Sequence, residues 1–345
     1  MNADELFEEL KTKLGTVLPE FELRQKAELA AEINRLKTQR HAVILGHNYM
    51  EPALFHFVAD ITGDSLELCR QAARTDKDPI VFCGVRFMAE TAKVLNPGRT
   101  VLLPSLEAGC SLAGGITAED VRRLKARYPG TPVVVYVNSY ADVKAEADCC
   151  CTSGNAAAVV EAMDSARVIF LPDEYLAGNV ARETGRRVVF ADPQATGPVP
   201  GPPEVPELIG WRARCEVHEQ FRVEDVQDVR RQFPDVAVLA HPECHPDVVA
   251  AADFAGGTAA MIRYVERSSA AHYLLLTECA MGDNIAAASP EKPLLRLCSV
   301  RCPHMNSITL EQTLAALRHD RYRIEVPEPI RSRAARAVER MLTIG

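Results

Sequence analysis

The string AVILGHNY at residues 42–49 runs from continuously apolar residues into a polar end. Two later strings have the same form, VVVYVNS at 133–139 and VAVLAHPEC at 236–244. Runs that are apolar throughout, rather than alternately apolar and polar, are typical of parallel strands whose two faces are both buried. We therefore expect three buried strands, each ending in polar side chains.

The surroundings of these strands repeat as well. The matching strand ends are His47, Asn138 and His241, which lie 91 and 103 residues apart. Each is followed, after 18, 15 and 17 residues, by a hydroxyl in a small-residue turn that leads into a helical stretch. These hydroxyls belong to Ser65, Ser153 and Thr258. Self-similarity of this kind indicates a repeated structural unit.

Each copy continues in the same way, with a second strand and helix, a third strand and then a cysteine. The second strands and their helices span 80–95, 168–185 and 273–288, and the third strands span 100–104, 187–192 and 293–297. The cysteines that follow are Cys110, Cys215 and Cys302. One plan of strand, helix, strand, helix, strand and cysteine thus occurs three times.

This plan predicts an α/β protein of three similar three-layer αβα domains, with short parallel sheets around a pseudo-threefold axis. The expected domains are 1–108 together with 304–345, then 109–214, and then 215–303. Ligands of open parallel sheets bind at the carboxyl ends of the strands. The polar strand ends are therefore expected to meet at a central site.

Composition indicates which kinds of partner the protein lacks and in which cellular compartment it is expected. The chain has 345 residues, with 39 basic and 47 acidic side chains and a net charge of -8. A nucleic-acid-binding protein is expected to carry a basic stripe, so nucleic acid is not the expected partner. No apolar run reaches the roughly 18 residues of a membrane span, and the N-terminus lacks the order of charges and apolar residues of a signal peptide. We expect a cytoplasmic protein that does not bind a membrane.

The eleven cysteines call for an explanation, because disulfides are disfavoured in the cytosol. A structural zinc ion takes four ligands, whereas one cysteine per repeat supplies three. Three thiolates around an axis suit a [4Fe–4S] cluster with one iron left unligated by protein, and such an iron is a Lewis acid suited to dehydration. Scattered core thiols are the alternative. The run Cys149–Cys151 is interpreted as turn residues, and Cys298 is placed to form a disulfide with Cys302 on oxidation.

The hydroxyls and strand ends suggest a substrate site. A helix N-terminus that carries a hydroxyl can bind an anion, so Ser65, Ser153 and Thr258 are candidate contacts for carboxylates or phosphate, with simple helix capping as the alternative. The polar strand ends add groups that can donate and accept protons, since a buried glutamate can be tuned toward neutral pH. These groups are His47, Tyr49, Tyr136, Asn138, His241 and Glu243.

Two other classes of protein stay open at this point. One is a nucleotide-binding or regulatory α/β protein, although the glycine-containing turns do not match the dinucleotide or P-loop patterns. The other is a metal-storage or redox-sensing protein that uses the cysteine run. A brown, oxygen-sensitive preparation, tight nucleotide binding, or reversible thiol oxidation without a cluster would distinguish the three.

At these residues the sequence resembles the quinolinate synthase family, iron–sulfur enzymes of NAD biosynthesis, over nearly the whole chain. The motifs that carry the resemblance occur in the family's order. They are GHNY (46–49), GDS (63–65), GVRFMAETAK (84–93), EAGCSLA (107–113), YVNS (136–139), CTSGNA (151–156), Cys215-x-x-His218, HPEC (241–244) and CPHM (302–305).

The resemblance implies a [4Fe–4S] cluster held by Cys110, Cys215 and Cys302. It implies condensation of iminoaspartate with dihydroxyacetone phosphate to give quinolinate, phosphate and water, with the open iron acting in dehydration. Transient contact with the enzyme that produces iminoaspartate is a further expectation.

The resemblance also implies a role for each candidate residue. The catalytic group would be His47, Tyr49, Tyr136, His241 and Glu243. Substrate would be bound by Ser65, Asn138, Ser153 and Thr258.

The sequence departs from the family pattern at two positions of this site. Met50 stands where the family has glutamine after the first motif, and Gly257 stands where the third hydroxyl turn has serine. The second departure predicts the loss of one anion contact. Family members often carry a CxxC pair before the third cysteine. Here Cys298 is the one cysteine near Cys302, and its spacing differs from that pattern.

Overall fold

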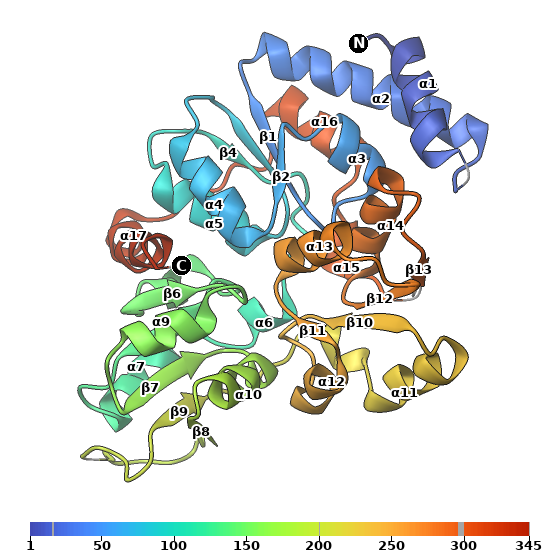
Figure 1. The fold of residues 1–345 in the computed structure, drawn as a ribbon. Coiled ribbons are helices and arrows are strands. Elements are labelled where there is room, and N and C mark those ends of the chain that lie inside the picture. The colour runs from blue at the N-terminus through green and yellow to red at the C-terminus, as the bar shows by residue number, and fades with distance from the viewer. Residues whose placement is uncertain (16, 200, 296–299, 345) are drawn as a thin grey trace. The chain divides into compact units, whose positions relative to one another are not determined.

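The structure is a computed structural model that describes residues 1–15, 17–199, 201–295 and 300–344. It is an α/β fold with three parallel sheets, each flanked by helices (Figure 1). The expected α/β class and the three sheets are confirmed. Cys298 and the end of the expected strand 293–297 lie outside the described residues.

The first sheet has the strand order β2-β1-β3-β4, and all its strands run parallel. The strands are β1 (Val43–His47), β2 (Ile61–Gly63), β3 (Ile80–Cys83) and β4 (Val101–Leu102). Every residue of β1, β3 and β4 is buried, as the continuous apolar runs predicted.

The second sheet has the order β6-β5-β7-β9-β8. Its strands are β5 (Val133–Tyr136), β6 (Cys149–Cys151), β7 (Arg167–Leu171), β8 (Arg187–Phe190) and β9 (Glu207–Gly210). Strand β9 lies between β7 and the expected third strand β8, and the sequence reasoning did not anticipate it. The interpretation of the cysteine run as a turn is wrong, because Cys149, Cys150 and Cys151 form buried strand β6, paired with Val134, Val135 and Tyr136.

The third sheet repeats the order of the first, β11-β10-β12-β13. Its strands are β10 (Val236–Ala240), β11 (Phe254–Ala255), β12 (His272–Leu276) and β13 (Leu294–Leu295). In all three sheets the first strand of the copy lies between the short strand that follows it and the next long strand. The repeat found in the sequence is therefore a repeat of topology.

One aspartate in each copy joins the first strand to the short strand beside it. The aspartate directly precedes the short strand; its carboxylate accepts an N–H from the first strand at 2.7–2.8 Å, and its own N–H donates to the carbonyl of the same residue at 2.8–2.9 Å. The pairs are Asp60 with Ile44, Asp148 with Val133 and Asp253 with Val238. This shared clamp fixes the register from which the site residues follow.

The chain forms two compact units by its internal contacts. The first comprises Met1–Ala108, Asp235–Ala237 and Thr258–Glu325. Its helices are α1 (Ala3–Leu14), α2 (Glu20–Gln39), α3 (Pro52–Phe57), α4 (Ser65–Arg74), α5 (Arg86–Leu95), α13 (Thr258–Arg267), α14 (Cys279–Ala288), α15 (Pro303–Asn306) and α16 (Leu310–His319). Helix α4 packs on β1 and β2, and α16 packs between β3 and α2.

The second unit comprises Gly109–Pro234, Val238–Gly257 and Val326–Gly345. Its helices are α6 (Ser111–Gly114), α7 (Ala118–Arg127), α8 (Ala141–Lys144), α9 (Ala156–Ala162), α10 (Glu174–Glu183), α11 (Val223–Gln232), α12 (Pro246–Ala251) and α17 (Glu328–Leu342), with a 3₁₀ turn at His218–Gln220. Helix α17 packs on β6 and α8. The division into three domains and the pseudo-threefold axis stay predictions.

In the described part of the chain, no helix is both long and apolar enough to cross a membrane.

Candidate active site

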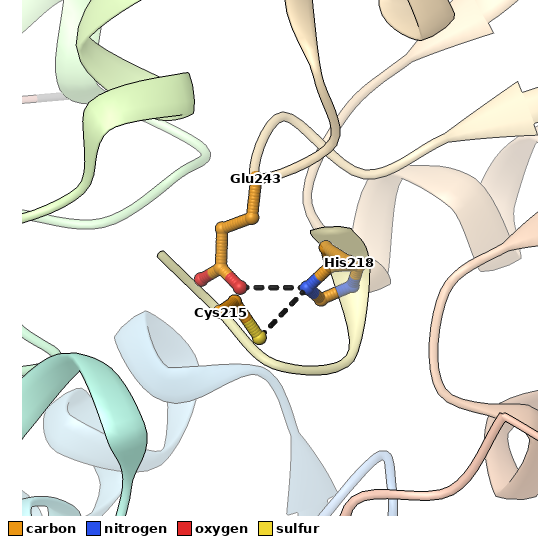
Figure 2. A group of neighbouring side chains, drawn as sticks. All are labelled: Cys215, His218 and Glu243. Atoms are coloured by element: carbon orange, nitrogen blue, oxygen red, sulfur yellow. Dashed lines mark hydrogen bonds and ion pairs between the residues drawn. The ribbon is translucent and has the colours of Figure 1, made fainter. Parts of the chain in front are cut away.

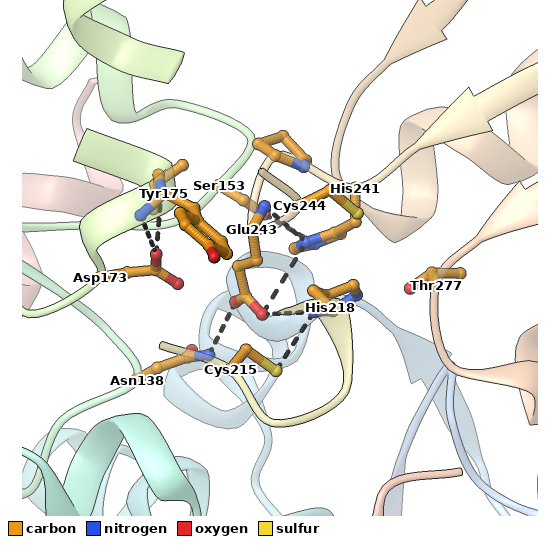
Figure 3. Close-up of polar contacts among 12 residues, drawn as sticks. Asn138, Ser153, Asp173, Tyr175, Cys215, His218, His241, Glu243, Cys244 and Thr277 are labelled. Atoms are coloured by element: carbon orange, nitrogen blue, oxygen red, sulfur yellow. Dashed lines mark hydrogen bonds and ion pairs between the residues drawn. The ribbon is translucent and has the colours of Figure 1, made fainter. Parts of the chain in front are cut away.

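The second unit gathers its polar strand ends around one buried carboxylate, that of Glu243, three residues beyond β10 (Figure 3). Its Oε1 accepts a hydrogen bond from the Tyr136 hydroxyl at 2.5 Å and another from Asn138 Nδ2 at 3.1 Å. Tyr136 ends β5, and Asn138 lies two residues beyond it. The ends of β5 and β10, which belong to different sheets, thus supply both sides of this contact.

The other carboxylate oxygen of Glu243 faces His218. Its Oε2 lies 2.7 Å from Nδ1 of His218, a buried residue that begins the 3₁₀ turn. The same Nδ1 lies 3.2 Å from Cys215 Sγ (Figure 2). Cys215, His218 and Glu243 therefore form a compact group of thiol, imidazole and carboxylate.

A second imidazole lies against the first. The rings of His218 and His241 stack with centroids 4.5 Å apart. The backbone N–H of Glu243 donates to His241 Nδ1 at 3.3 Å, which places the proton of neutral His241 on Nε2, 3.3 Å from Ser153 Oγ. His241 can therefore donate a proton toward the Ser153 side of the group.

The electrostatics of Glu243 keep it ionised. Burial raises the pKa of its carboxyl, but the charges of His218 and His241 and the hydrogen bonds from His218 and Tyr136 outweigh burial, so the pKa lies well below its usual range. Burial and the Glu243 charge raise the pKa of the Tyr136 hydroxyl well above its usual value. The group thus holds one carboxylate, one protonated phenol and two imidazoles.

Two of the three predicted cluster cysteines are neighbours in this unit. Burial raises the pKa of the Cys215 thiol most, followed by the charge of Glu243 and then that of Cys110. Cys110 directly precedes α6. Cys110, Cys215 and Cys302 are half-buried, whereas the other seven described cysteines are buried.

The first unit positions a second group at the end of β1. The Tyr49 hydroxyl lies 2.5 Å from Thr277 Oγ1, and Asn48 Nδ2 donates to Thr258 Oγ1 at 2.9 Å. The Tyr49 N–H donates to His47 Nδ1 at 3.2 Å, which matches the bond from Glu243 to His241 in the second unit. Tyr49 thus contacts both His47 and Thr277, and Thr258 is bonded to Asn48, the residue between His47 and Tyr49.

The remaining predicted residues of the first unit begin helices. Ser65 is the first residue of α4, but Asp64 caps that helix by accepting the Glu67 N–H. Capping therefore does not explain Ser65. Cys302 is the N-cap of α15, and its N–H lies near the carboxylate of Glu278.

Both family departures have a structural account. The Met50 side chain is buried in the apolar core. A Cβ atom on Gly257 would lie 3.2 Å from Ser153 Oγ, so a serine there would crowd the hydroxyl that contacts His241.

Sequence reasoning assigned no role to four residues that the structure places in these networks. Asn48 lies between the predicted His47 and Tyr49 and donates to Thr258. His218 was visible as the partner of Cys215 three residues earlier. Thr277 follows β12, and Asn284 lies on α14; neither carried a motif signal.

Asn284 holds the loop that carries Tyr49. Its buried Nδ2 donates to the carbonyls of Asn48 at 3.1 Å and Met50 at 2.8 Å. Two carbonyls on either side of Tyr49 thus depend on one side chain.

We expect Asn284→Ala to lower the free energy of unfolding by about 2–3 kcal/mol, because it leaves two buried carbonyls unpaired. Urea unfolding measures this effect. Asn306→Ala, at an exposed asparagine of the same unit, is the matched control and should stay within about 0.5 kcal/mol of the parent chain. Equal stability of the two variants would contradict the anchoring role.

Comparison with known proteins identifies the family. The family model for quinolinate synthetase A protein matches residues 31–343. Quinolinate synthase 2 of Mesorhizobium japonicum is 54% identical over 309 residues, which cover 90% of this chain and 89% of that protein.

Two further relatives agree. The quinolinate synthase of Agrobacterium fabrum is 50% identical over 335 residues, 97% of this chain and 91% of that protein. That of Xylella fastidiosa is 53% identical over 312 residues, 90% of this chain and 86% of that protein. With similarity over nearly its whole length, and with the resemblance seen in its motifs confirmed, the chain belongs to the quinolinate synthase family.

Proposed function

We propose that this enzyme condenses iminoaspartate with dihydroxyacetone phosphate and releases quinolinate, phosphate and two waters. The observation that carries the proposal is 50–54% identity to quinolinate synthases over at least nine-tenths of the chain. The buried group around Glu243 supports it, because ring formation with loss of two waters requires repeated proton transfer.

In this proposal the second unit moves protons. The Glu243 carboxylate, bonded to Tyr136 and His218, is the proton acceptor, and its low pKa means that it holds an accepted proton only weakly and passes it on readily. His241, which carries its proton toward Ser153, is the acid. His47 and Tyr49 are the catalytic groups of the first unit.

The substrates carry carboxylates and a phosphate, and the proposed anion contacts are Ser65, Asn138, Ser153 and Thr258. Three of these side chains are already oriented by hydrogen bonds. Asn138 bonds Glu243, Ser153 contacts His241, and Thr258 accepts from Asn48. Such support holds a substrate-binding group in place before the substrate arrives.

The proposed cofactor is a [4Fe–4S] cluster held by Cys110, Cys215 and Cys302. The donor set fits, since these three thiols alone among the ten described cysteines are not fully buried. When bound, the cluster supplies a Lewis-acidic iron that polarises a hydroxyl group leaving as water.

The proposed partners are the two small-molecule substrates and, transiently, the enzyme that makes iminoaspartate. Iminoaspartate is an imine that water hydrolyses, so a short transfer between enzymes would protect it. The proposed location is the cytoplasm.

Iron and sulfide content, with a visible spectrum of anaerobically purified protein, tests the cofactor. We expect about four irons per chain, lost in Cys110→Ala, Cys215→Ala and Cys302→Ala. The controls Cys149→Ala and Cys150→Ala, at buried strand cysteines, should keep the iron. Quinolinate formation measured on the same samples should follow the iron content.

A colourless protein that is indifferent to the three changes would overturn the cluster. An iron-loaded protein that forms no quinolinate from the two substrates would overturn the reaction.

A further inference from the structure

The side chains of Cys215, His218 and Glu243 supply three ligand atoms of the kind that bind a single metal ion. One atom from each side chain, the thiol Sγ, the imidazole Nδ1 and a carboxylate oxygen, lies within 4.8 Å of the other two. Nδ1 lies 3.2 Å from Sγ and 2.7 Å from Oε2 (Figure 2). His218 and Glu243 are buried, and Cys215 is half-buried.

The donor atoms select the kind of metal. Thiolate and imidazole favour Zn²⁺ and similar borderline ions, whereas Mg²⁺ and Ca²⁺ take oxygen ligands. Tetrahedral Zn²⁺ with bonds of about 2.0–2.3 Å sets its ligand atoms about 3.3–3.5 Å apart. The distances from His218 Nδ1 to Glu243 Oε2 and to Cys215 Sγ therefore need to widen by about 0.3–0.6 Å, and the distance from the thiol to the carboxylate, which is within 4.8 Å, has to become about 3.5 Å. Bonds to the ion then replace the present hydrogen bonds.

The surroundings hold the ligands in the orientation that an ion needs. Tyr136 and Asn138 both bond Oε1 of Glu243 and leave Oε2 turned toward His218. The ring of His241 stacks on that of His218 and fixes its plane. Carboxylate ligands supported by such outer contacts are a common feature of protein metal sites.

Charge favours the same ion. Cys215 Sγ and a Glu243 oxygen both lie against the same nitrogen of His218, so a thiolate and a carboxylate would share this small space. A divalent cation neutralises both groups, and the thiol proton passes to the solvent when the ion binds.

We propose that, in the absence of an iron–sulfur cluster, Cys215, His218 and Glu243 bind one Zn²⁺, with water as the fourth ligand. Zinc at this site takes Cys215 from the cluster and so blocks cluster assembly. The competition rests on the proposed cluster, whereas the binding itself does not.

Cobalt(II) is the probe, because it occupies zinc sites and its thiolate bond gives a charge-transfer absorption band. We expect cluster-free full-length protein to bind one Co²⁺ with a thiolate band and tetrahedral d–d bands, and one equivalent of Zn²⁺ to remove them. Cys215→Ala should abolish the thiolate band. His218→Ala and Glu243→Gln should each weaken Co²⁺ binding by about 10–100-fold or more.

Two control variants separate this site from others. Cys110→Ala removes a proposed cluster ligand and should leave Co²⁺ affinity unchanged. His245→Ala, at an exposed histidine of the same unit, should also leave it unchanged. Circular dichroism and urea unfolding of every variant show whether it is folded.

The second arm tests the competition. Protein loaded with Zn²⁺ should take up iron and sulfide only after a chelator removes the zinc. Absence of a thiolate band, a band that survives in both His218→Ala and Glu243→Gln, or a band lost in folded Cys110→Ala would overturn the assignment. If the parent chain binds cobalt as expected but never takes up iron, the metal site stands and the proposed cluster fails.

Discussion

Glu243→Gln is expected to lower the kcat of quinolinate formation by about 10²–10⁴-fold while the protein stays folded. Glutamine keeps an oxygen for the Tyr136 and Asn138 hydrogen bonds. It removes the charge that makes Glu243 a base. Steady-state kinetics of the anaerobically reconstituted enzyme measure the loss.

The matched variants isolate the carboxylate. Glu243→Ala should lose the same activity and also about 3–5 kcal/mol of stability, because its buried partners lose their acceptor. Glu183→Gln makes the same chemical change at an exposed position of α10 and should leave kcat unchanged. Iron content must be equal in the samples compared, since a lost cluster would imitate a lost base.

A Glu243→Gln enzyme with full kcat and a raised KM would contradict the catalytic role and leave Glu243 as a binding residue. A kcat loss confined to the alanine variant would assign it to positioning.

The fold could be predicted because its signal is local. The three apolar strings became β1, β5 and β10, and the order of the elements within each copy followed. A further signal was present and unused: an Ala-Asp pair precedes each small-residue turn, at 59–60, 147–148 and 252–253. Its aspartate is the clamp between strands.

The sequence did not predict strands β6 and β9, because both form by pairing with strands that are distant in sequence. The run Cys149–Cys151 resembles a turn because small residues follow it, yet it pairs with β5 as a parallel strand. Strand β9 begins where the proline- and glycine-rich stretch 193–207 ends, and it is held in the sheet by pairing with β7 and β8.

The kinds of residues in the site could be predicted from the sequence, but only some of the contacts between them could. Residue chemistry at strand ends indicated an acid and a base, and the structure joins Tyr136, Asn138 and Glu243 directly. The partner on the other side, His218, lies on a 3₁₀ turn rather than at a strand end. The repeat therefore gave no reason to place it there.

Glu278→Gln is expected to make the cluster-free protein more stable above neutral pH. Glu278 is a buried N-cap of α14, and its Oε2 accepts the Ala280 N–H at 2.7 Å. Burial raises the pKa of its carboxyl to about 7, although the Ala280 N–H, the Arg301 charge and the Cys302 N–H oppose the shift.

The direction of this pH dependence of stability follows from proton binding at Glu278. Between about pH 4.5 and 7 the folded chain binds a proton at Glu278 that the unfolded chain has released. The stabilising contribution is complete below the unfolded pKa and is lost as pH rises through about 7. The full loss is roughly 3 kcal/mol, at about 1.4 kcal/mol for each pH step between the two pKa values.

Glutamine imitates the protonated carboxyl and still accepts the Ala280 N–H, so the variant should lack this loss. We expect equal unfolding free energies near pH 4.5 and a variant more stable by up to roughly 3 kcal/mol at pH 8. Urea unfolding at several pH values between these limits measures the difference. Glu291→Gln, at an exposed glutamate of the same unit, should show the same pH dependence of the unfolding free energy as the parent chain. If Glu278→Gln also showed that pH dependence, the carboxyl would be charged throughout, and another group would have to stabilise that charge inside the first unit.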